Sequence, residues 1–437
     1  MGDLKIAVIG GGSTGSAIIH DLASRGLDVT LIEKSTIGGG TSGRFHGLLH
    51  SGARYAVNDP KAAEESILDN QVISNIASHC VEDTGGVFLA LKGDDQSFAD
   101  KFESACKRAG IPIESIPIEK LIQEEPFINK DASIAFSVPD KIINSFRFIT
   151  SLLLTAKSEG AKIRLGNEVV GFDVEDKTVK GVKVKDSISG ETETLKFDLV
   201  INASGAWAEK ILSDYLNINS IKMVLSAGTM AVVGRRFAKR VINRLRLPSD
   251  GDIVVPYFTE SIIGTTSFIV DDPDNFEVDE DDFKFLLGEG AKLIPAIKEY
   301  GMKRYFAGVR PLIAADESES NDSRSISRDF RIFDHETTDG VSGIMTIVGG
   351  KLSTARLMGK QISDFVCDKL GIKTQSNTDK IKLLWPDISN DNVKDLSKSL
   401  SIPESLLKEI LFETESKTYG DIYSPVKDLL LSKKLFS

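Results

Sequence analysis

Cysteine is scarce in this chain. Only three of its 437 residues are cysteines, Cys80, Cys106 and Cys367, and they lie far apart in the sequence. Because no Cys-x-x-Cys pair occurs, we expect no zinc or iron–sulfur site held by cysteines, and no other metal site is predicted. The sparse, odd count is typical of a reducing compartment, so we expect the three thiols to be small buried side chains.

A long hydrophobic run and an excess of basic residues are also missing. No stretch of about 18 apolar residues occurs, so no transmembrane helix is predicted, and the first strand begins so close to Met1 that we expect no signal peptide. The net charge of −11 argues against a nucleic-acid partner, which needs a basic surface, and against unaided adhesion to anionic lipid. These absences favour a cytoplasmic globular protein, and the length suggests two or three domains.

A glycine-rich turn between two strands stands at the start of the chain. Gly10 permits a tight turn, Gly12 lets the backbone approach a pyrophosphate, and Gly15 lets helix and strand pack closely. The pyrophosphate would lie on the unpaired N–H groups that open the helix, and Glu33 would accept hydrogen bonds from ribose hydroxyls. This pattern predicts a dinucleotide site, but both NAD and FAD use it. The strand, turn, helix, strand and acidic residue follow in order: Ile6–Ile9, Gly10-x-Gly12-x-x-Gly15, 16–25, Val29–Ile32 and Glu33.

Three later stretches point to the same cofactor. Residues 35–51 are dense in glycine and interleaved with histidine and arginine, which favours a ligand-lining backbone over a flexible surface loop. The apolar strand that begins near Asp198 ends in small residues, as the third strand of a dinucleotide domain would. Gly343–Lys351 repeats the opening pattern of strand, paired glycines and helix, which places the positive end of a helix against an anionic group.

Several segments resemble the FAD-dependent glycerol-3-phosphate dehydrogenases, most closely the catalytic A-subunit type of the anaerobic enzyme. The similarity runs in one register from about residue 3 to residue 370. The family belongs to the D-amino-acid-oxidase-like flavoproteins. The segments that carry the resemblance are Gly40–Tyr55, Ile263–Thr266, Ala307–Leu312, Ile326–Asp329 and Val348–Arg356.

The resemblance implies a mixed α/β and α+β fold. A Rossmann-type FAD-binding domain would be interrupted by a β-rich substrate domain and followed by a short helical C-terminal tail. Within the substrate domain, the pattern places Arg310 just after a tight apolar turn and indicates that the acidic residues 271–282 form a solvated surface loop. The expected parts are 1–84, 145–212 and 336–376 for FAD, 85–144 and 213–335 for substrate, and 377–437 for the tail.

The activity implied by the resemblance is oxidation of sn-glycerol 3-phosphate to dihydroxyacetone phosphate. Hydride would pass from substrate C2 to flavin N5, and the electrons would go on to a quinone or to an electron-accepting, membrane-anchoring subunit. The protein would then be cytoplasmic or peripheral on the inner face of the cell membrane. A homodimer stays an open alternative.

Basic and aromatic residues in family register are expected to bind the substrate. Guanidinium groups suit a phosphate dianion because each can bind two oxygens at once. His50 is the preferred general base, since an ordinary histidine has a pKa near 6.5, and His46 is the reserve candidate. Arg310 and Lys351 are the other expected catalytic groups. The predicted substrate-binding residues are Arg54, Tyr55, Arg310, Arg328 and Lys351.

The predicted cofactor-binding residues come from all the glycine-rich stretches. They are Gly10, Gly12, Ser13, Thr14, Gly15, Glu33, Lys34, Gly40, Thr41, Ser42, His46, Gly47, Leu49, Val169, Ala203, Gly205, Trp207, Gly308, Gly350, Lys351, Leu352 and Ser353.

The chain departs from the wider family at one informative position. Relatives carry a histidine just before an Ile-Val-Val-Pro segment, where this chain has Asp252, so that histidine's role does not transfer. Two alternatives stay open: a same-fold FAD oxidase or dehydrogenase for an amine or 2-hydroxy acid, and a non-catalytic, flavin-bound subunit that binds a partner. An NAD dehydrogenase fits less well, because the terminal Gly-Gly-Lys helix suits an enclosed flavin.

Overall fold

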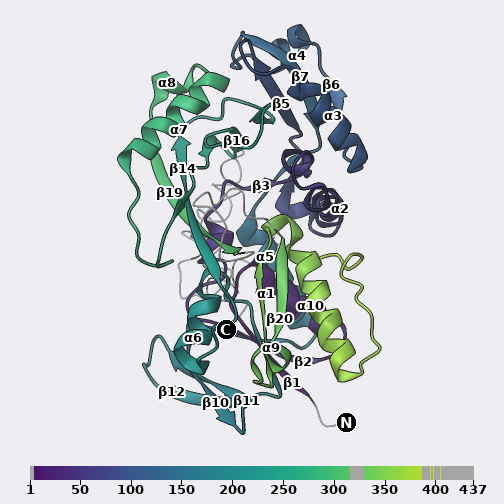
Figure 1. The fold of residues 1–437 in the computed structure, drawn as a ribbon, viewed down its shortest axis with the longest axis vertical. Helices are drawn as coiled ribbons and strands as arrows, with labels where there is room; N and C mark the ends of the chain where they lie inside the picture. Colours follow the sequence, from purple (N-terminus) through teal and green to yellow (C-terminus); the bar gives the residue numbers. More distant parts are fainter. Residues whose placement is uncertain (1–3, 315–328, 386–393, 395–396, 398–403, 405–437) are drawn as a thin grey trace.

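Two β-sheets divide the molecule into two lobes (Figure 1). The computed structural model describes residues 4–314 and 329–385, together with residues 394, 397 and 404. The first lobe is built on a six-stranded sheet whose strands are parallel except β20, which runs antiparallel to β21. The order across this sheet is β20 (Phe330–Asp334), β21 (Ile344–Gly349), β13 (Leu199–Asn202), β1 (Lys5–Ile9), β2 (Asp28–Glu33) and β9 (Lys162–Leu165).

Alternating side chains of these strands enter two different cores. Ile6 and Val8 of β1 pack with helices on one face of the sheet, whereas Ala7 and Ile9 pack on the opposite face. Because neighbouring strand residues point to opposite faces, a strand that is apolar throughout must be covered on both sides. The helices on the first face are α1 (Ser13–Ser24), α5 (Ser145–Ser158) and α10 (Ala355–Leu370); the other face carries the small sheet β10 (Asn167–Glu175), β11 (Thr178–Asp186), β12 (Thr192–Lys196) and α6 (Ala208–Leu216).

The second lobe holds a larger, mostly antiparallel sheet. Helices cover it at both ends in Figure 1, and the long antiparallel pair β14–β19 descends from it toward the first lobe. Its strands are β5 (Gly86–Leu91), β6 (Glu114–Ser115), β7 (Ala132–Val138), β14 (Met223–Val233), β15 (Val241–Arg244), β16 (Ile253–Tyr257), β17 (Glu260–Gly264), β18 (Phe268–Ile269) and β19 (Arg304–Ile313), and its helices are α3 (Phe98–Arg108), α4 (Ile118–Glu124), α7 (Glu280–Leu293) and α8 (Ile297–Tyr300).

Short elements join the lobes around α2 (Pro60–Ile76). The side chain of Asp59 caps this helix by accepting the Ala62 N–H at 3.1 Å, and Pro60 occupies the first helical position, where its missing N–H costs nothing. The remaining elements are the three-stranded sheet of β3 (Leu48–Leu49), β8 (Lys141–Ile143) and β4 (Val81–Glu82), the single turns η1 (Thr41–Gly43), η2 (Ala53–Tyr55), η3 (Ser78–Cys80), η4 (Gly205–Trp207) and η5 (Leu352–Thr354), and α9 (His335–Asp339).

The predicted architecture is confirmed, with two local changes. Strand β20 pairs with β21 in the first sheet, so we place the second boundary of the substrate domain before residue 330 rather than after 335. Arg310 does not follow a turn; it lies inside β19, where an apolar and glycine-rich strand was mistaken for a loop. All three cysteines are buried, as expected.

The predicted helical tail lies largely outside the described residues. Residues 377–385 are described and are not helical. They pack back on the first lobe, where the Leu383 N–H bonds the Ile76 carbonyl at 2.8 Å and Trp385 stacks on His79 with ring centroids 5.7 Å apart. Among the described residues, no helix is long and apolar enough to cross a membrane, and no group of three or more His, Cys, Asp or Glu side chains could hold a metal ion.

Candidate active site

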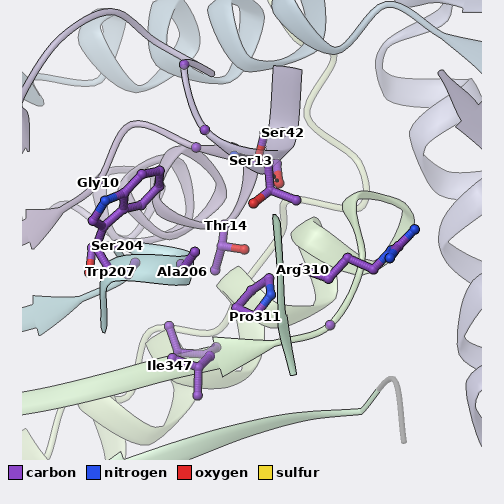
Figure 2. Close-up of a pocket in the computed structure, with 18 of the residues that line it drawn as sticks. Gly10, Ser13, Thr14, Ser42, Ser204, Ala206, Trp207, Arg310, Pro311 and Ile347 are labelled. Atoms are coloured by element: carbon purple, nitrogen blue, oxygen red, sulfur yellow. Dashed lines mark hydrogen bonds between the residues drawn. The ribbon is translucent and has the colours of Figure 1, made fainter. Parts of the chain in front are cut away.

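A cavity of about 580 Å³ opens at the carboxyl ends of the first sheet. Ile9 and Glu33 line it where β1 and β2 end, and Val348 lines it near the end of β21. This edge is where parallel α/β sheets bind their ligands. Figure 2 shows Trp207 and Arg310 on opposite sides of the view, with Ser13, Thr14 and Ser42 between them. Residues of both lobes, Trp207 and Arg310 among them, therefore line the cavity.

The turn after β1 leaves no room for side chains at Gly10 and Gly15. Gly10 has φ of +108°, and a Cβ there would lie 2.7 Å from the Ala203 carbonyl oxygen. A Cβ on Gly15 would lie 1.9 Å from the Gly10 carbonyl oxygen. Gly12 at the N-cap of α1 carries no side chain, and the start of the helix lines the cavity through Gly12, Ser13 and Thr14, as the dinucleotide motif requires. The Ser13 N–H donates to the Ser42 hydroxyl at 3.0 Å.

Glu33 is held at the cavity wall by backbone donors. One carboxylate oxygen accepts the Gly11 N–H at 2.7 Å, and the other accepts the Ser35 N–H at 2.8 Å. The Ser35 hydroxyl is a third donor, at 3.2 Å. An ionised carboxylate can accept about four hydrogen bonds, so capacity is left for one hydroxyl group. This geometry fits the ribose of a dinucleotide, as the sequence predicts.

A contact between the lobes closes the rim near Trp207. The indole N–H donates to Asp274 at 2.6 Å, and Lys34 Nζ lies 4.3 Å from the centre of the indole ring and 3.6 Å from the same carboxylate. All three residues line the cavity. Asp274 belongs to the acidic loop that was expected to be only solvated surface. No local pattern marks it, because its partner is far away in the sequence.

Aromatic and basic side chains gather at the opposite end. The His50 ring lies 5.4 Å from the Tyr55 ring and 5.9 Å from the His46 ring, centre to centre. Lys351 Nζ lies 4.4 Å above the Tyr55 ring, within the range of a cation–π contact. All of these residues line the cavity together with Arg310. The structure thus brings together four predicted substrate or catalytic residues and the reserve base.

Arg310 reaches this end across strand β14. Its guanidinium donates to the Ser226 hydroxyl at 3.3 Å and to the Thr266 carbonyl at 3.2 Å, and also bonds the Thr265 hydroxyl. A Cβ on Gly228 would lie 2.2 Å from Nη2 of Arg310. The glycine on β14 is therefore what lets the guanidinium cross the strand.

His46 is kept neutral by its surroundings. Burial, followed by the positive charges of Arg54 and Arg310, lowers its pKa to about 3. Its Nδ1 accepts the Leu48 N–H at 3.2 Å, so the proton of the neutral ring sits on Nε2. A ring with a low pKa and a fixed Nδ1 acceptor is a poor general base, which favours His50 over His46 for that role.

The buried histidines predict how stability depends on pH. Burial lowers the pKa of His20 to about 4, so protonation favours the unfolded chain and stability is lost as pH falls below about 6.5. We expect the free energy of unfolding at pH 5 to fall by about 2 kcal/mol relative to pH 8 on account of His20. Urea unfolding at both pH values should show a correspondingly smaller difference for His20→Gln. An equal difference in the variant would contradict the assignment.

Most predicted cofactor residues line the cavity, and a few do not. Gly15 and Gly308 lie behind the wall, and a Cβ on Gly308 would lie 2.2 Å from the Arg44 carbonyl oxygen. Gly47 lies against the Tyr257 ring. Those that line it are Gly10, Gly12, Ser13, Thr14, Glu33, Lys34, Gly40, Thr41, Ser42, His46, Val169, Ala203, Gly205, Trp207, Gly350, Lys351, Leu352 and Ser353.

Two further predicted residues, Leu49 and Arg54, do not line the cavity. Leu49 is predicted to bind the cofactor; its neighbour Leu48 lines the cavity, while Leu49 packs in a core on the other side of the two-residue strand. Arg54 does not line the cavity; it is turned toward Asp252, with Nη2 at 3.3 Å from the carboxylate. Arg328 lies outside the described residues. Cavity-lining residues that were not predicted include Arg44, Ser204 and Asp274.

Comparisons with known proteins agree with a dinucleotide-binding site in this cavity. The family model described as FAD dependent oxidoreductase matches residues 5–364. The A subunit of the anaerobic glycerol-3-phosphate dehydrogenase of Escherichia coli K12 is 41% identical over 94% of this chain and 76% of its own length. The A1 subunit of the corresponding enzyme of Haloferax volcanii is 40% identical over 86% of this chain and 65% of its own length.

The fold is shared with solved flavoproteins. The glycerol-3-phosphate dehydrogenase of Bacillus halodurans, solved with FAD, superposes with a TM-score of 0.68 at 22% identity, covering 94% of this chain and 75% of that one. The glycine turn, the Glu33 carboxylate and the start of α1 that lines the cavity fit FAD. FAD is therefore the cofactor, and the chain belongs to the FAD-dependent oxidoreductase family, among the relatives of the anaerobic glycerol-3-phosphate dehydrogenase A subunits.

Proposed function

We propose that this chain oxidises sn-glycerol 3-phosphate to dihydroxyacetone phosphate. The observation that carries the proposal is the pair of cations, Arg310 and Lys351, at the end of the cavity away from the nucleotide-binding turn. A phosphate dianion needs more positive charge than a carboxylate does, and guanidinium groups match its geometry. The names of the relatives at about 40% identity point to the same substrate.

Lys351 and the turn around it supply positive potential at this end. Lys351 precedes η5 and α10, directly after the two positive-φ glycines Gly349 and Gly350. A fixed ammonium and a helix N-terminus both stabilise negative charge that develops beside them. A bound FAD would supply the acceptor for the hydride of substrate C2 at this end of the cavity. Tyr55, under Lys351, limits where the substrate can lie.

The proton of the substrate hydroxyl goes to His50 in this proposal. The ring lies among cavity-lining residues and beside Tyr55. We expect His50→Asn to lower kcat by about 100- to 10,000-fold and to remove the acid limb of the pH–rate profile. His79→Asn is the matched control, because His79 bonds Ser151 outside the cavity lining. A His50→Asn enzyme with the parent pH profile would reject this base.

The electrons leave through a partner in this proposal. The relatives are named as A subunits, which implies other subunits in those assemblies, and we extend this to an electron-accepting or membrane-anchoring partner for this chain. Quantitative recovery of the purified chain alone on membranes would count against the need for an anchoring partner.

Anaerobic titration tests the proposed substrate. We expect sn-glycerol 3-phosphate to bleach the flavin absorbance of the purified protein, while lactate and sarcosine leave it unchanged. Bleaching by lactate or sarcosine instead would favour a same-fold enzyme for a 2-hydroxy acid or an amine. No bleaching by any phosphorylated polyol would favour a non-catalytic flavin-bound subunit.

A further inference from the structure

A buried carboxylate behind the cavity wall holds an arginine of the predicted substrate site. Asp252 lies directly before β16, and its side chain is fully buried. The carboxylate accepts hydrogen bonds from Arg54 Nη2 at 3.3 Å, from Arg246 Nε at 2.8 Å and Nη2 at 2.6 Å, and from the Ser249 N–H at 2.5 Å. These four hydrogen bonds, from two guanidinium groups and one amide, use all that a carboxylate can accept.

The two arginines depend on this carboxylate to different degrees. Arg246 has a second acidic partner, Glu289, at 3.2 Å. Arg54 Nη2 donates to Asp252 and to the Ser249 carbonyl at 3.1 Å, and in the described part of the chain Asp252 is its one recorded ion-pair partner. Loss of the Asp252 charge would therefore affect Arg54 more than Arg246.

Both ends of Arg54 are fixed, and one nitrogen is left without a partner. Its backbone lies in η2, which approaches α2 closely because Gly52 has φ of +92° and a Cβ there would lie 2.3 Å from the Ala63 carbonyl oxygen. The guanidinium is tied through Nη2. Nη1 is buried and makes no hydrogen bond to any described residue. A buried charged donor of this kind calls for an acceptor.

The charge of Arg54 acts on the substrate end of the cavity, although the side chain does not line it. It is one of two arginines that lower the pKa of the cavity residue His46, the other being Arg310. The next residue in the chain, Tyr55, is itself part of the cavity wall. Arg54 therefore places positive charge behind the cavity wall at the end where Tyr55 and Arg310 lie.

We propose that Asp252 is a positioning residue that holds Arg54 through Nη2 so that Nη1 donates to the anionic head of the substrate. The proposal rests on the proposed function and deepens it. Asp252 itself touches no substrate and, with four donors already on its two oxygens, is not placed to act as a base.

Binding of inorganic phosphate to the FAD-loaded full chain tests the proposal. Calorimetry should give a Kd about 10- to 100-fold higher for Asp252→Asn than for the parent. KM for sn-glycerol 3-phosphate should rise similarly, with kcat changed less than about threefold. Arg246→Gln is the matched control: it disturbs the same buried cluster and should lower Tm, yet leave the phosphate Kd within about threefold of the parent value.

A mutant cycle with Arg54→Lys separates positioning from general destabilisation. Once Arg54→Lys is present, Asp252→Asn should add little further loss of phosphate affinity. If the fold-increases in the phosphate Kd of the two single variants multiply in the double variant, the proposal is overturned. An Asp252→Asn protein with a lowered Tm and an unchanged phosphate Kd would overturn it as well. If Asp252→Asn does not fold, Asp252→Glu keeps the charge but moves it by one methylene; it should weaken phosphate binding with Tm nearly retained, and parent-like binding would again overturn the proposal.

The outcome is separable from that of the proposed function. If sn-glycerol 3-phosphate fails to bleach the parent flavin while phosphate binding still depends on Asp252, the substrate assignment fails and the positioning role stands. If bleaching occurs and the phosphate Kd is unchanged in Asp252→Asn, the substrate assignment stands and the positioning role fails.

Discussion

Replacing Arg310 by methionine is expected to lower kcat/KM for sn-glycerol 3-phosphate by about 100-fold, which corresponds to about 3 kcal/mol. The guanidinium lies at the cavity end where Lys351 and Tyr55 also lie. It is held there by acceptors on β14 and on the segment after β17, so it is organised before substrate arrives. Steady-state kinetics with the FAD-loaded protein measure the effect, and KM should carry most of it because an uncharged thioether cannot bind phosphate.

Arg304→Met is the matched control for this prediction. Arg304 lies on the same strand, but its side chain is exposed and pairs with Glu260 on the outside of the second lobe. We expect its kcat/KM to stay within about threefold of the parent value, since exposed ion pairs contribute little. If kcat/KM falls equally in both variants, the loss reflects removal of any positive charge from β19, and Arg310 has no specific role in binding the substrate.

Replacing Gly15 by alanine is expected to weaken FAD binding by about 10- to 100-fold. The new Cβ would lie 1.9 Å from the Gly10 carbonyl oxygen, so α1 must move away from the turn that receives the pyrophosphate. Overpacking of this kind costs about 1–3 kcal/mol, and part of that cost falls on the helix start that binds the cofactor. Flavin fluorescence during dilution of the holoprotein measures the change in Kd.

Gly288→Ala is the matched control for the glycine substitution. Gly288 lies within α7, has no positive φ, and a Cβ there would meet no atom within 4 Å. Alanine in a helix interior is favoured over glycine by about 1 kcal/mol, so Tm should stay level or rise and FAD affinity should not change. Parent-like FAD binding in Gly15→Ala would contradict the close packing at the turn.

The first lobe was predictable from sequence because its information is local. Its strands β1, β13 and β21 are short apolar runs, and the turn after β1 carries glycines whose φ or close contacts exclude larger residues. Gly10, Gly12 and Glu33 lie within about 25 residues of one another, so their spacing could be checked without knowledge of the fold. The cofactor end of the site therefore followed from the motif.

The residues at the substrate end of the cavity could not be predicted fully, because their positions depend on tertiary contacts that the spacing of residues in the sequence does not reveal. Leu48 and Leu49 are equivalent in a sequence pattern, and only the pairing of β3 with β8 decides which one faces the cavity. Arg310 looked like a loop residue because glycine and proline flank it, yet the β14–β19 ladder accepts both. Proline is tolerated in a strand where no ladder hydrogen bond is needed from its nitrogen.

Charged residues far apart in the sequence were the hardest to assign. Asp274 lies in the acidic stretch that was expected to be solvated surface, but it bonds Trp207. Asp252 comes directly before an apolar strand, and no local pattern shows that its carboxylate is fully buried between arginines. A carboxylate is buried only when donors surround it, and those donors come from remote parts of the chain. Their roles therefore depend on the tertiary structure.

The bond between Trp207 and Asp274 joins the two lobes at the rim of the cavity. It connects the loop before α7 to the first lobe, and Lys34 adds an ion pair to the same carboxylate. Both contacts are exposed to solvent, and exposed ion pairs contribute little to stability. Separating the lobes at this point therefore costs little free energy, and the fold does not depend on this contact to stay intact.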